Sequence, residues 1–247
     1  MFIIITVGIL LFTALFLLVL RFALPNFRFA WPAATGGALL AWISVFFWQS
    51  GMPALLQIPF WQPEGVFRQS PLFIADGISW AFSLSIVTIC LAVIITSVAR
   101  ENFPGPLGWV GVSALTALGV LAVTADNPLT LVLLWAAIDL TEIVSQMRFV
   151  EDPRLSERAV ISFASRVTGI LILLWASMVS ASDGSVLDFL SPAPQAGLYL
   201  IIAAAFRLGV LPLHLPYASE SSFRRGFGTA LRMISAGSSL ILLARIP

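Results

Sequence analysis

Residues 1–20 read MFIIITVGILLFTALFLLVL, a run of twenty side chains without a charge. An apolar helix of about 20 residues is long enough to cross the hydrocarbon core of a bilayer. The run has neither a basic segment before it nor a small-residue cleavage site after it, which are the marks of a cleaved secretion signal. We therefore expect a retained membrane span at the start of the chain.

The composition of the whole chain agrees with a membrane environment. Of its 247 residues, 59% are hydrophobic and 10% are charged, whereas a soluble domain carries about 25% charged residues. Secreted, nucleic-acid-binding and stand-alone soluble enzyme classes are therefore excluded. The single cysteine, Cys90, provides neither a disulfide framework nor a thiolate metal site, and we expect no metal or other cofactor in this chain.

Seven further apolar segments follow the first, so the sequence predicts an all-α, polytopic transmembrane bundle of about eight spans. Asp76 and Asn127 stand where N-caps of the third and fifth spans are expected. We divide the chain into residues 1–72, with two spans and a loop, and residues 73–247, with the other six. The expected spans after the first are 31–48, 73–99, 107–124, 128–147, 159–179, 196–213 and 229–246.

The basic residues are all arginines, and their distribution predicts the topology. The connections between spans one and two, three and four, five and six, and seven and eight together hold eight of the 13. The opposite side holds Arg68 and Arg245. Because arginine-rich loops stay in the cytoplasm, both termini are predicted to lie on the non-cytoplasmic side of an inner (cytoplasmic) membrane.

Four charged residues fall inside predicted spans: Asp139, Glu142, Arg166 and Arg207. A charge that faces lipid costs at least about 2.5 kcal/mol, so these side chains should face the bundle interior, pair, or line a wet cavity. Asp139 and Glu142 are three residues apart and share a helix face, and Arg166 on the next span is placed to neutralise either one. Two interpretations stay open, a hydrated path for protons or cations and a static ion pair that locks two helices.

The seventh predicted span is interrupted near its end. Pro212 and Pro216 each remove a helical hydrogen bond, and Gly209 permits distortion, so the helix should break there. Freed carbonyls beside Arg207 are the kind of group with which discontinuous transporter helices bind ions. His214 is predicted on the same face as Arg207, either as a proton carrier or as an ordinary interfacial histidine.

Five segments in the same order resemble those of a known family. Residues 207–214, RLGVLPLH, resemble the Lys-Ser-Ala-Gln-x-Pro-x-His stretch on the broken seventh helix of the antiporter-like subunits. Those subunits belong to respiratory complex I, Mrp-type cation/proton antiporters and their relatives. The other four segments are 76–79 (DGIS), 127–135 (NPLTLVLLW), 165–167 (SRV) and 229–237 (TALRMISAG).

The resemblance implies a proton relay whose key positions have changed. The family uses a glutamate, a lysine and a lysine or histidine on helices five, seven and eight, where this chain has Ala136, Arg207 and Ser235. An arginine stays protonated at physiological pH, so Arg207 cannot replace a titrating lysine. Asp139, one turn from Ala136, is a candidate replacement carboxylate. The leading expectation is a degenerate member that has largely lost its relay.

Family members have about fourteen helices with two inverted five-helix repeats, and this chain corresponds to the first repeat, as a split or truncated member would. The resemblance therefore implies obligate membrane partners, such as other antiporter-like subunits, together with lipid and a possible soluble partner. The chain would not be catalytic alone, but would serve assembly or coupling in an NADH-quinone-oxidoreductase-type translocase. The alternatives are an active subunit with a rerouted path, and the membrane subunit of a proton-driven inorganic-carbon uptake system with a soluble zinc partner.

Overall fold

The computed structural model describes residues 2–24, 29–58, 61, 69–99, 105–148, 153–212 and 227–246, without the side chains of residues 153–156 and 158. The described part contains eight α-helices: α1 (Phe2–Ala23), α2 (Ala30–Phe46), α3 (Gly77–Ser97), α4 (Gly105–Thr124), α5 (Pro128–Met147), α6 (Pro153–Ser182), α7 (Pro194–Leu208) and α8 (Phe227–Arg245). A 3-10 helix, η1 (Phe47–Gly51), and two short strands, β1 (Ala54–Gln57) and β2 (Leu72–Ala75), join α2 to α3.

The predicted all-α membrane bundle is confirmed. Among the described residues, seven helical segments are long and apolar enough to cross a bilayer, with η1 extending the second of them to Gly51. The exception is α7, which has 15 residues. Its apolar composition matches the others, but Gly209 ends it early.

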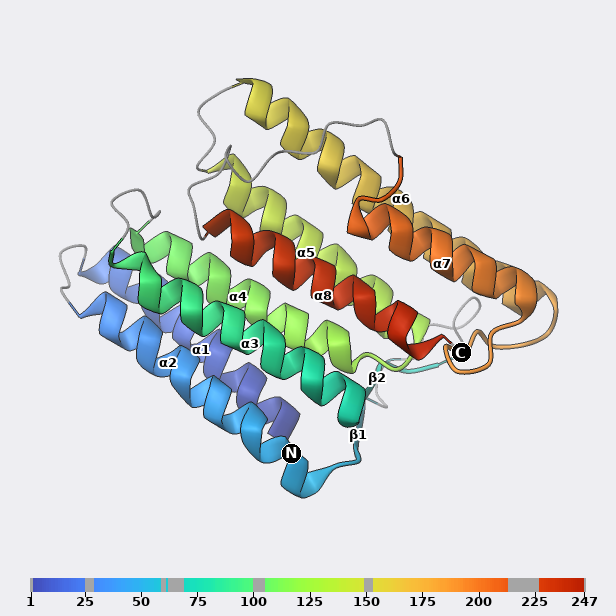
Figure 1. Ribbon diagram of the computed structural model, residues 1–247, viewed down its shortest axis with the longest axis horizontal. Helices are drawn as coiled ribbons and strands as arrows, with labels where there is room; N and C mark the ends of the chain where they lie inside the picture. Colours follow the sequence, from blue (N-terminus) through green and yellow to red (C-terminus); the bar gives the residue numbers. More distant parts are fainter. Residues whose placement is uncertain are drawn as a thin grey trace.

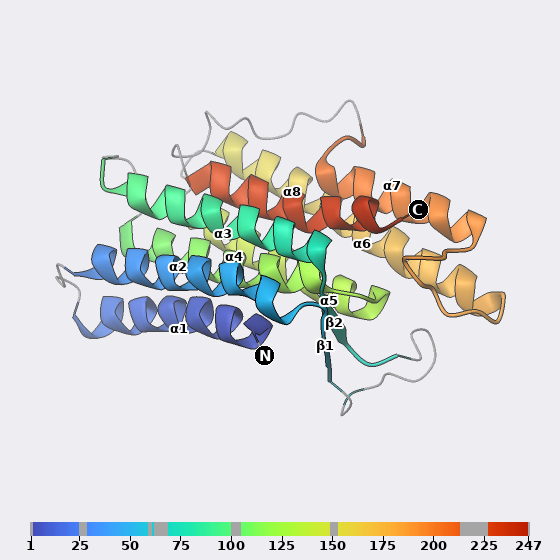
Figure 2. The ribbon, with the colours of Figure 1, turned by 60° about the horizontal axis from the view of Figure 1, so that its bottom comes forward.

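The helices run in alternating directions and lie side by side in one elongated bundle (Figure 1). Helix α4 occupies the middle of the bundle and packs against α1, α3, α5 and α8. Helices α6 and α7 pack closely together at the edge of the bundle farthest from α1 and α2 (Figure 1). Figure 2 shows the small hairpin of β1 and β2 projecting beyond the helices. Helices α1, α3 and α5 finish at the same end of the bundle, toward the left of Figure 1, which we call the arginine-rich end; α7 runs in the same direction but stops short of it.

Close approach of the helices depends on small residues. A Cβ atom added to Gly169 of α6 would lie 2.8 Å from the Ala203 carbonyl oxygen of α7. A Cβ atom at Gly119 of α4 would lie 2.6 Å from a methyl group of Ile234 on α8. Such small residues allow the backbones of membrane helices to approach, which strengthens their packing.

The expected third span, 73–99, was wrong at its start. Residues 72–75 form β2, which pairs antiparallel with β1 so that Ala54 lies opposite Ala75. The helix begins only after Asp76, whose carboxylate accepts a hydrogen bond from the Ser79 amide at 2.7 Å in a capping box. The cap was predicted correctly. The four apolar residues before it, Leu72–Ala75, form their backbone hydrogen bonds in a hairpin instead of a helix.

The expected seventh span, 196–213, was also too long. Helix α7 ends at Leu208, because Gly209 adopts a left-handed conformation with φ of 75°. The Val210 amide then donates to the Ala205 carbonyl at 3.0 Å, which closes the helix end. The break therefore precedes Pro212, and Pro216 lies outside the described residues.

Candidate functional site

One face of α5 carries a row of buried polar and aromatic side chains. Trp135, Asp139, Glu142 and Gln146 follow one another at intervals of four, three and four residues. Helical periodicity places such residues on a single stripe. All four side chains are buried, and Asp139 is 1% exposed. Carboxylates in such a setting require compensating charges.

Two arginines supply that compensation and join three helices. Arg207 Nη1 on α7 lies 2.5 Å from Asp139 Oδ2, and Arg166 Nε on α6 lies 3.7 Å from Asp139 Oδ1. Arg166 also forms an ion pair with Glu142, whose other oxygen accepts from Gln146 Nε2 at 2.8 Å. We call Asp139, Glu142, Arg166 and Arg207 the charge cluster. Its formal charges sum to zero.

Helix α8 provides hydroxyl groups to both arginines. Arg166 Nη1 donates to Ser235 Oγ and Arg207 Nε donates to Ser239 Oγ, each at 3.3 Å. The guanidinium carbon of Arg207 also lies 4.5 Å from the ring centre of Trp135, in a cation–π contact. The cluster therefore holds α5, α6, α7 and α8 at one level of the bundle.

A cavity of about 390 Å³ reaches the charge cluster. Glu142, Arg166 and Arg207 line it, together with the exposed Arg232 at the start of α8. One water occupies about 30 Å³ in the liquid, so the space accommodates several. Asp139 is not among the lining residues. The cavity thus distinguishes Glu142, which faces it, from Asp139, which is enclosed behind it.

Three buried guanidinium nitrogens of the charge cluster have no hydrogen-bond partner within the described part of the chain. These are Nε and Nη2 of Arg166 and Nη2 of Arg207. Buried donors are normally satisfied by protein or by ordered water. A cavity against the same two side chains provides room for such water.

The broken end of α7 is held by a side chain of α6. Ser165 Oγ lies 3.4 Å from the Phe206 carbonyl oxygen and 3.3 Å from the Leu211 carbonyl oxygen. A hydroxyl of this kind satisfies carbonyls that a continuous helix would have bonded. Arg207 meanwhile extends away from these carbonyls to Asp139.

The structure brings together five of the residues singled out from the sequence: Asp139, Glu142, Arg166, Arg207 and Ser235. Ala136 is partly buried against the apolar core, one turn before Asp139, and contributes no polar group. His214 lies outside the described residues, so its proposed link to Arg207 stays a prediction. Sequence reasoning did not assign roles to two contributors, Trp135 and Gln146. The helical spacing of Trp135 and Gln146 from the two carboxylates was the signal for them.

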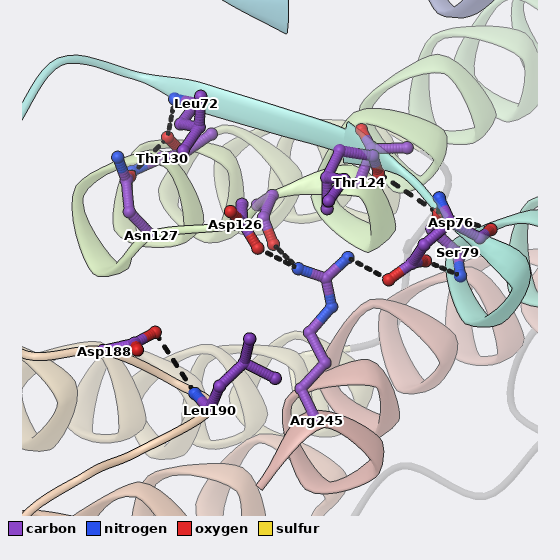
Figure 3. Close-up of polar contacts among 12 residues, drawn as sticks. Leu72, Asp76, Ser79, Thr124, Asp126, Asn127, Thr130, Asp188, Leu190 and Arg245 are labelled. Carbon is purple, nitrogen blue, oxygen red and sulfur yellow. Dashed lines mark hydrogen bonds and ion pairs between the residues drawn. The ribbon is translucent and has the colours of Figure 1, made fainter. Parts of the chain in front are cut away.

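A second ionic contact lies at the opposite end of the bundle (Figure 3). Arg245, predicted near the end of the eighth span on the side opposite the arginine-rich loops, is the last residue of α8 and is 6% exposed. Its Nη1 lies 2.9 Å from Asp126 Oδ1 and 2.8 Å from the Ala125 carbonyl oxygen, and its Nη2 lies 3.8 Å from Asp76 Oδ2. Burial raises the pKa of Asp126 above its usual value, although the charge of Arg245 opposes that shift. The contact ties α8 to the start of α3 and to the α4–α5 connection.

No protein-family model matches the sequence, and no curated protein matches it. Solved structures do share its fold. A chain in the structure of respiratory complex I from Thermus thermophilus with bound aureothin matches with a TM-score of 0.69 and 18% sequence identity. That match covers 98% of this chain and 53% of the other.

A chain of the membrane-bound sulfane sulfur reductase, an archaeal respiratory membrane complex, matches with a TM-score of 0.67 and 13% identity. This match covers 98% of the present chain and 41% of the reductase chain. The fold resembles that of chains from respiratory membrane complexes. The chain spans about half of the first relative's length and less of the second's. At the level of fold, the similarity agrees with the predicted resemblance to complex I.

Proposed function

We propose that this chain is an antiporter-like membrane subunit of a complex-I-like energy-converting assembly, in which the charge cluster locks helices together and does not relay protons. One observation carries the proposal. Asp139, the carboxylate closest to the altered relay position Ala136, is enclosed between Arg207 at 2.5 Å and Arg166 at 3.7 Å. Two arginines therefore compensate the charge of this carboxylate and hold it in place.

The partners of Asp139 strengthen the argument against a relay. Proton transfer requires a donor and an acceptor that change protonation during the cycle, and an arginine keeps its proton at physiological pH. Ser235, at the third relay position implied by the family resemblance, contributes a hydroxyl to Arg166 and no titratable group. The charge cluster is therefore neutral as a whole, and with Ser235 it is suited to holding α5 through α8 in register.

A role within a larger assembly fits the surface of the chain. Helices α6 and α7 expose large apolar side chains along their outer faces, including Leu171, Trp175 and Leu198, which are 58%, 52% and 58% exposed. Such faces require lipid or another membrane protein. Both structural relatives are longer chains from multi-subunit respiratory complexes. We propose membrane-protein partners and lipid for these faces.

A second candidate function rests on the cavity. Glu142 lines it, whereas Asp139 does not. A carboxylate beside a space large enough for water is a group that protons from the arginine-rich end could reach. In this alternative the chain conducts protons by a rerouted path that starts at Glu142.

Proton flux in proteoliposomes that contain the purified native assembly separates the two candidates. On our proposal, Glu142→Gln transports at the same rate as the unmodified protein, and Asp183→Asn, an exposed loop carboxylate, is the matched control. The combined change Ala136→Glu with Arg207→Lys restores a carboxylate and a titratable amine, and flux should rise. Loss of flux in Glu142→Gln, with the assembly intact by size-exclusion chromatography, would instead support the rerouted path.

A further inference from the structure

A second cavity lies on the membrane-facing side of the bundle, away from the charge cluster. It has a volume of about 350 Å³ and is formed by α1, α4 and α5. Helices α1 and α5 both pack on α4, and the floor between them consists of Gly111 and Ala114. Leu18 forms one wall, and Leu140 and Val144 form the other. We call this feature the α1/α5 groove.

The walls of the groove are mainly apolar, with hydroxyl groups at Thr141 and Ser145, and are open to the surroundings. Leu140 is 58% exposed and Val144 is 60% exposed. Both residues belong to a helix that is long and apolar enough to span the bilayer. In a membrane such a surface meets hydrocarbon, so the natural occupant of the groove is an apolar chain.

The groove ends in positive charge. Arg148, the residue after α5, lines it at the arginine-rich end, and exposed Arg21 lies one helical turn beyond Leu18 on α1. No ion pair engages either guanidinium within the ranges that the structure describes. The eight helical steps from Leu140 to Arg148 rise by about 12 Å, so the apolar walls and the cation belong to one continuous feature.

The start of α4 adds to this positive end. Leu107, in the first turn of α4, is also a lining residue. The first N–H groups of a helix have no partner in the preceding turn and carry the positive end of the helix dipole. Phosphate oxygens bind well both to such N–H groups and to guanidinium groups.

We propose that the α1/α5 groove binds an anionic phospholipid. One acyl chain lies along Gly111 and Ala114 between the walls, and the phosphate pairs with Arg148 and Arg21 at the arginine-rich end. The charge of this end selects the headgroup, because guanidinium groups at the bilayer surface attract anionic lipids in preference to neutral ones. The small residues of the floor provide the depth that a chain needs.

Lipid retention by the purified native assembly tests the proposal. The assembly is placed in nanodiscs of phosphatidylcholine with a minor share of phosphatidylglycerol, is then released, and the phospholipid that stays bound is identified by native mass spectrometry. We expect selective retention of phosphatidylglycerol. Arg148→Gln should lower it about fivefold, the effect of about 1 kcal/mol per interfacial arginine, and Arg148→Lys should keep most of it.

Two further variants examine the groove itself and the specificity of the charge. Ala114→Leu fills the floor without altering any charge and should also release the phosphatidylglycerol. Arg232→Gln removes an exposed arginine at the same end of the bundle, outside the groove, and should leave retention unchanged.

Three results would overturn the proposal. Equal retention of the two lipids means that no anionic site exists. Sensitivity to Arg148→Gln without sensitivity to Ala114→Leu means that the arginine attracts lipid but that the groove holds none. A photo-crosslinker at Val144 that captures a protein chain in native membranes means that a partner helix covers the groove.

Discussion

Removal of the charge of Asp139 should destabilise the bundle strongly. Asp139→Asn keeps the size of the side chain but leaves the two arginines of the cluster opposite one carboxylate, Glu142. Loss of one partner from a buried ion pair costs about 3–5 kcal/mol, because the other charge stays desolvated and uncompensated. Arg207→Gln should cost a similar amount, since it leaves Asp139 with only the more distant Arg166 at 3.7 Å.

The double variant Asp139→Asn with Arg207→Gln should be more stable than the sum of the single changes predicts. It removes both charges of the pair and restores neutrality to the remaining Glu142 and Arg166. Two unit charges 4 Å apart interact by about 4 kcal/mol at an effective dielectric constant of about 20. We therefore expect the two losses to fall short of additivity by about 2–4 kcal/mol.

Equilibrium unfolding in mixed micelles, with a rising share of sodium dodecyl sulfate, measures these free energies. Tryptophan emission is a suitable signal, because Trp135 lies 4.5 Å from the Arg207 guanidinium. Asp183→Asn, an exposed carboxylate outside the helices, serves as the control and should change stability by less than about 0.5 kcal/mol. Additivity of the two single losses within about 0.5 kcal/mol would refute the pairing of Asp139 with Arg207.

Three other predictions concern helix packing and can be checked by the same unfolding measurement. Gly169→Ala should destabilise by about 1–3 kcal/mol because the new methyl group overpacks the contact between α6 and α7, whereas Gly8→Ala, with nothing within 4 Å, should not destabilise. Gly209→Ala should cost about 1–2 kcal/mol, since alanine tolerates the left-handed conformation poorly, and unchanged stability would contradict the observed helix end. Arg245→Gln should cost about 1–3 kcal/mol through the unpaired Asp126 and should increase proteolysis of the α4–α5 connection; equal cleavage would argue against its clamping role.

Much of the fold follows from the sequence because a bilayer leaves the backbone few choices. Each apolar run of sufficient length must bond its own amides and carbonyls, and a helix does so within one segment. The N-caps were predictable because each depends on residues close in sequence. The Asp76 side chain accepts a hydrogen bond from the Ser79 amide, and the Asn127 side chain accepts one from the Thr130 amide. The hairpin of β1 and β2 was missed because its strands have four residues each and depend on pairing with one another.

The candidate site was predictable in membership but not in pairing. The free-energy cost of a charge inside the bilayer identified four residues, because such charges must pair: Asp139, Glu142, Arg166 and Arg207. Spacing suggested that Arg166 would neutralise a carboxylate, and it contacts both. That Arg207 turns toward Asp139, away from the carbonyls of the broken helix, depends on how α7 packs against α5 and α6. Local sequence does not encode that arrangement.

The positions of the two carboxylates along α5 link structure to function. Measured along the helix, Glu142 lies about 8 Å from the end of α5 and Asp139 about 12 Å. The cavity reaches Glu142 and stops before Asp139, which Arg207 covers from the side of α7. A proton that entered from the arginine-rich end would therefore meet Arg166 and Arg207 beyond Glu142, and neither releases or accepts a proton. On our proposal, Arg207 thus acts as a barrier at the position where the resemblance implies a relay lysine, while it keeps the ion pair with Asp139 that holds the helices together.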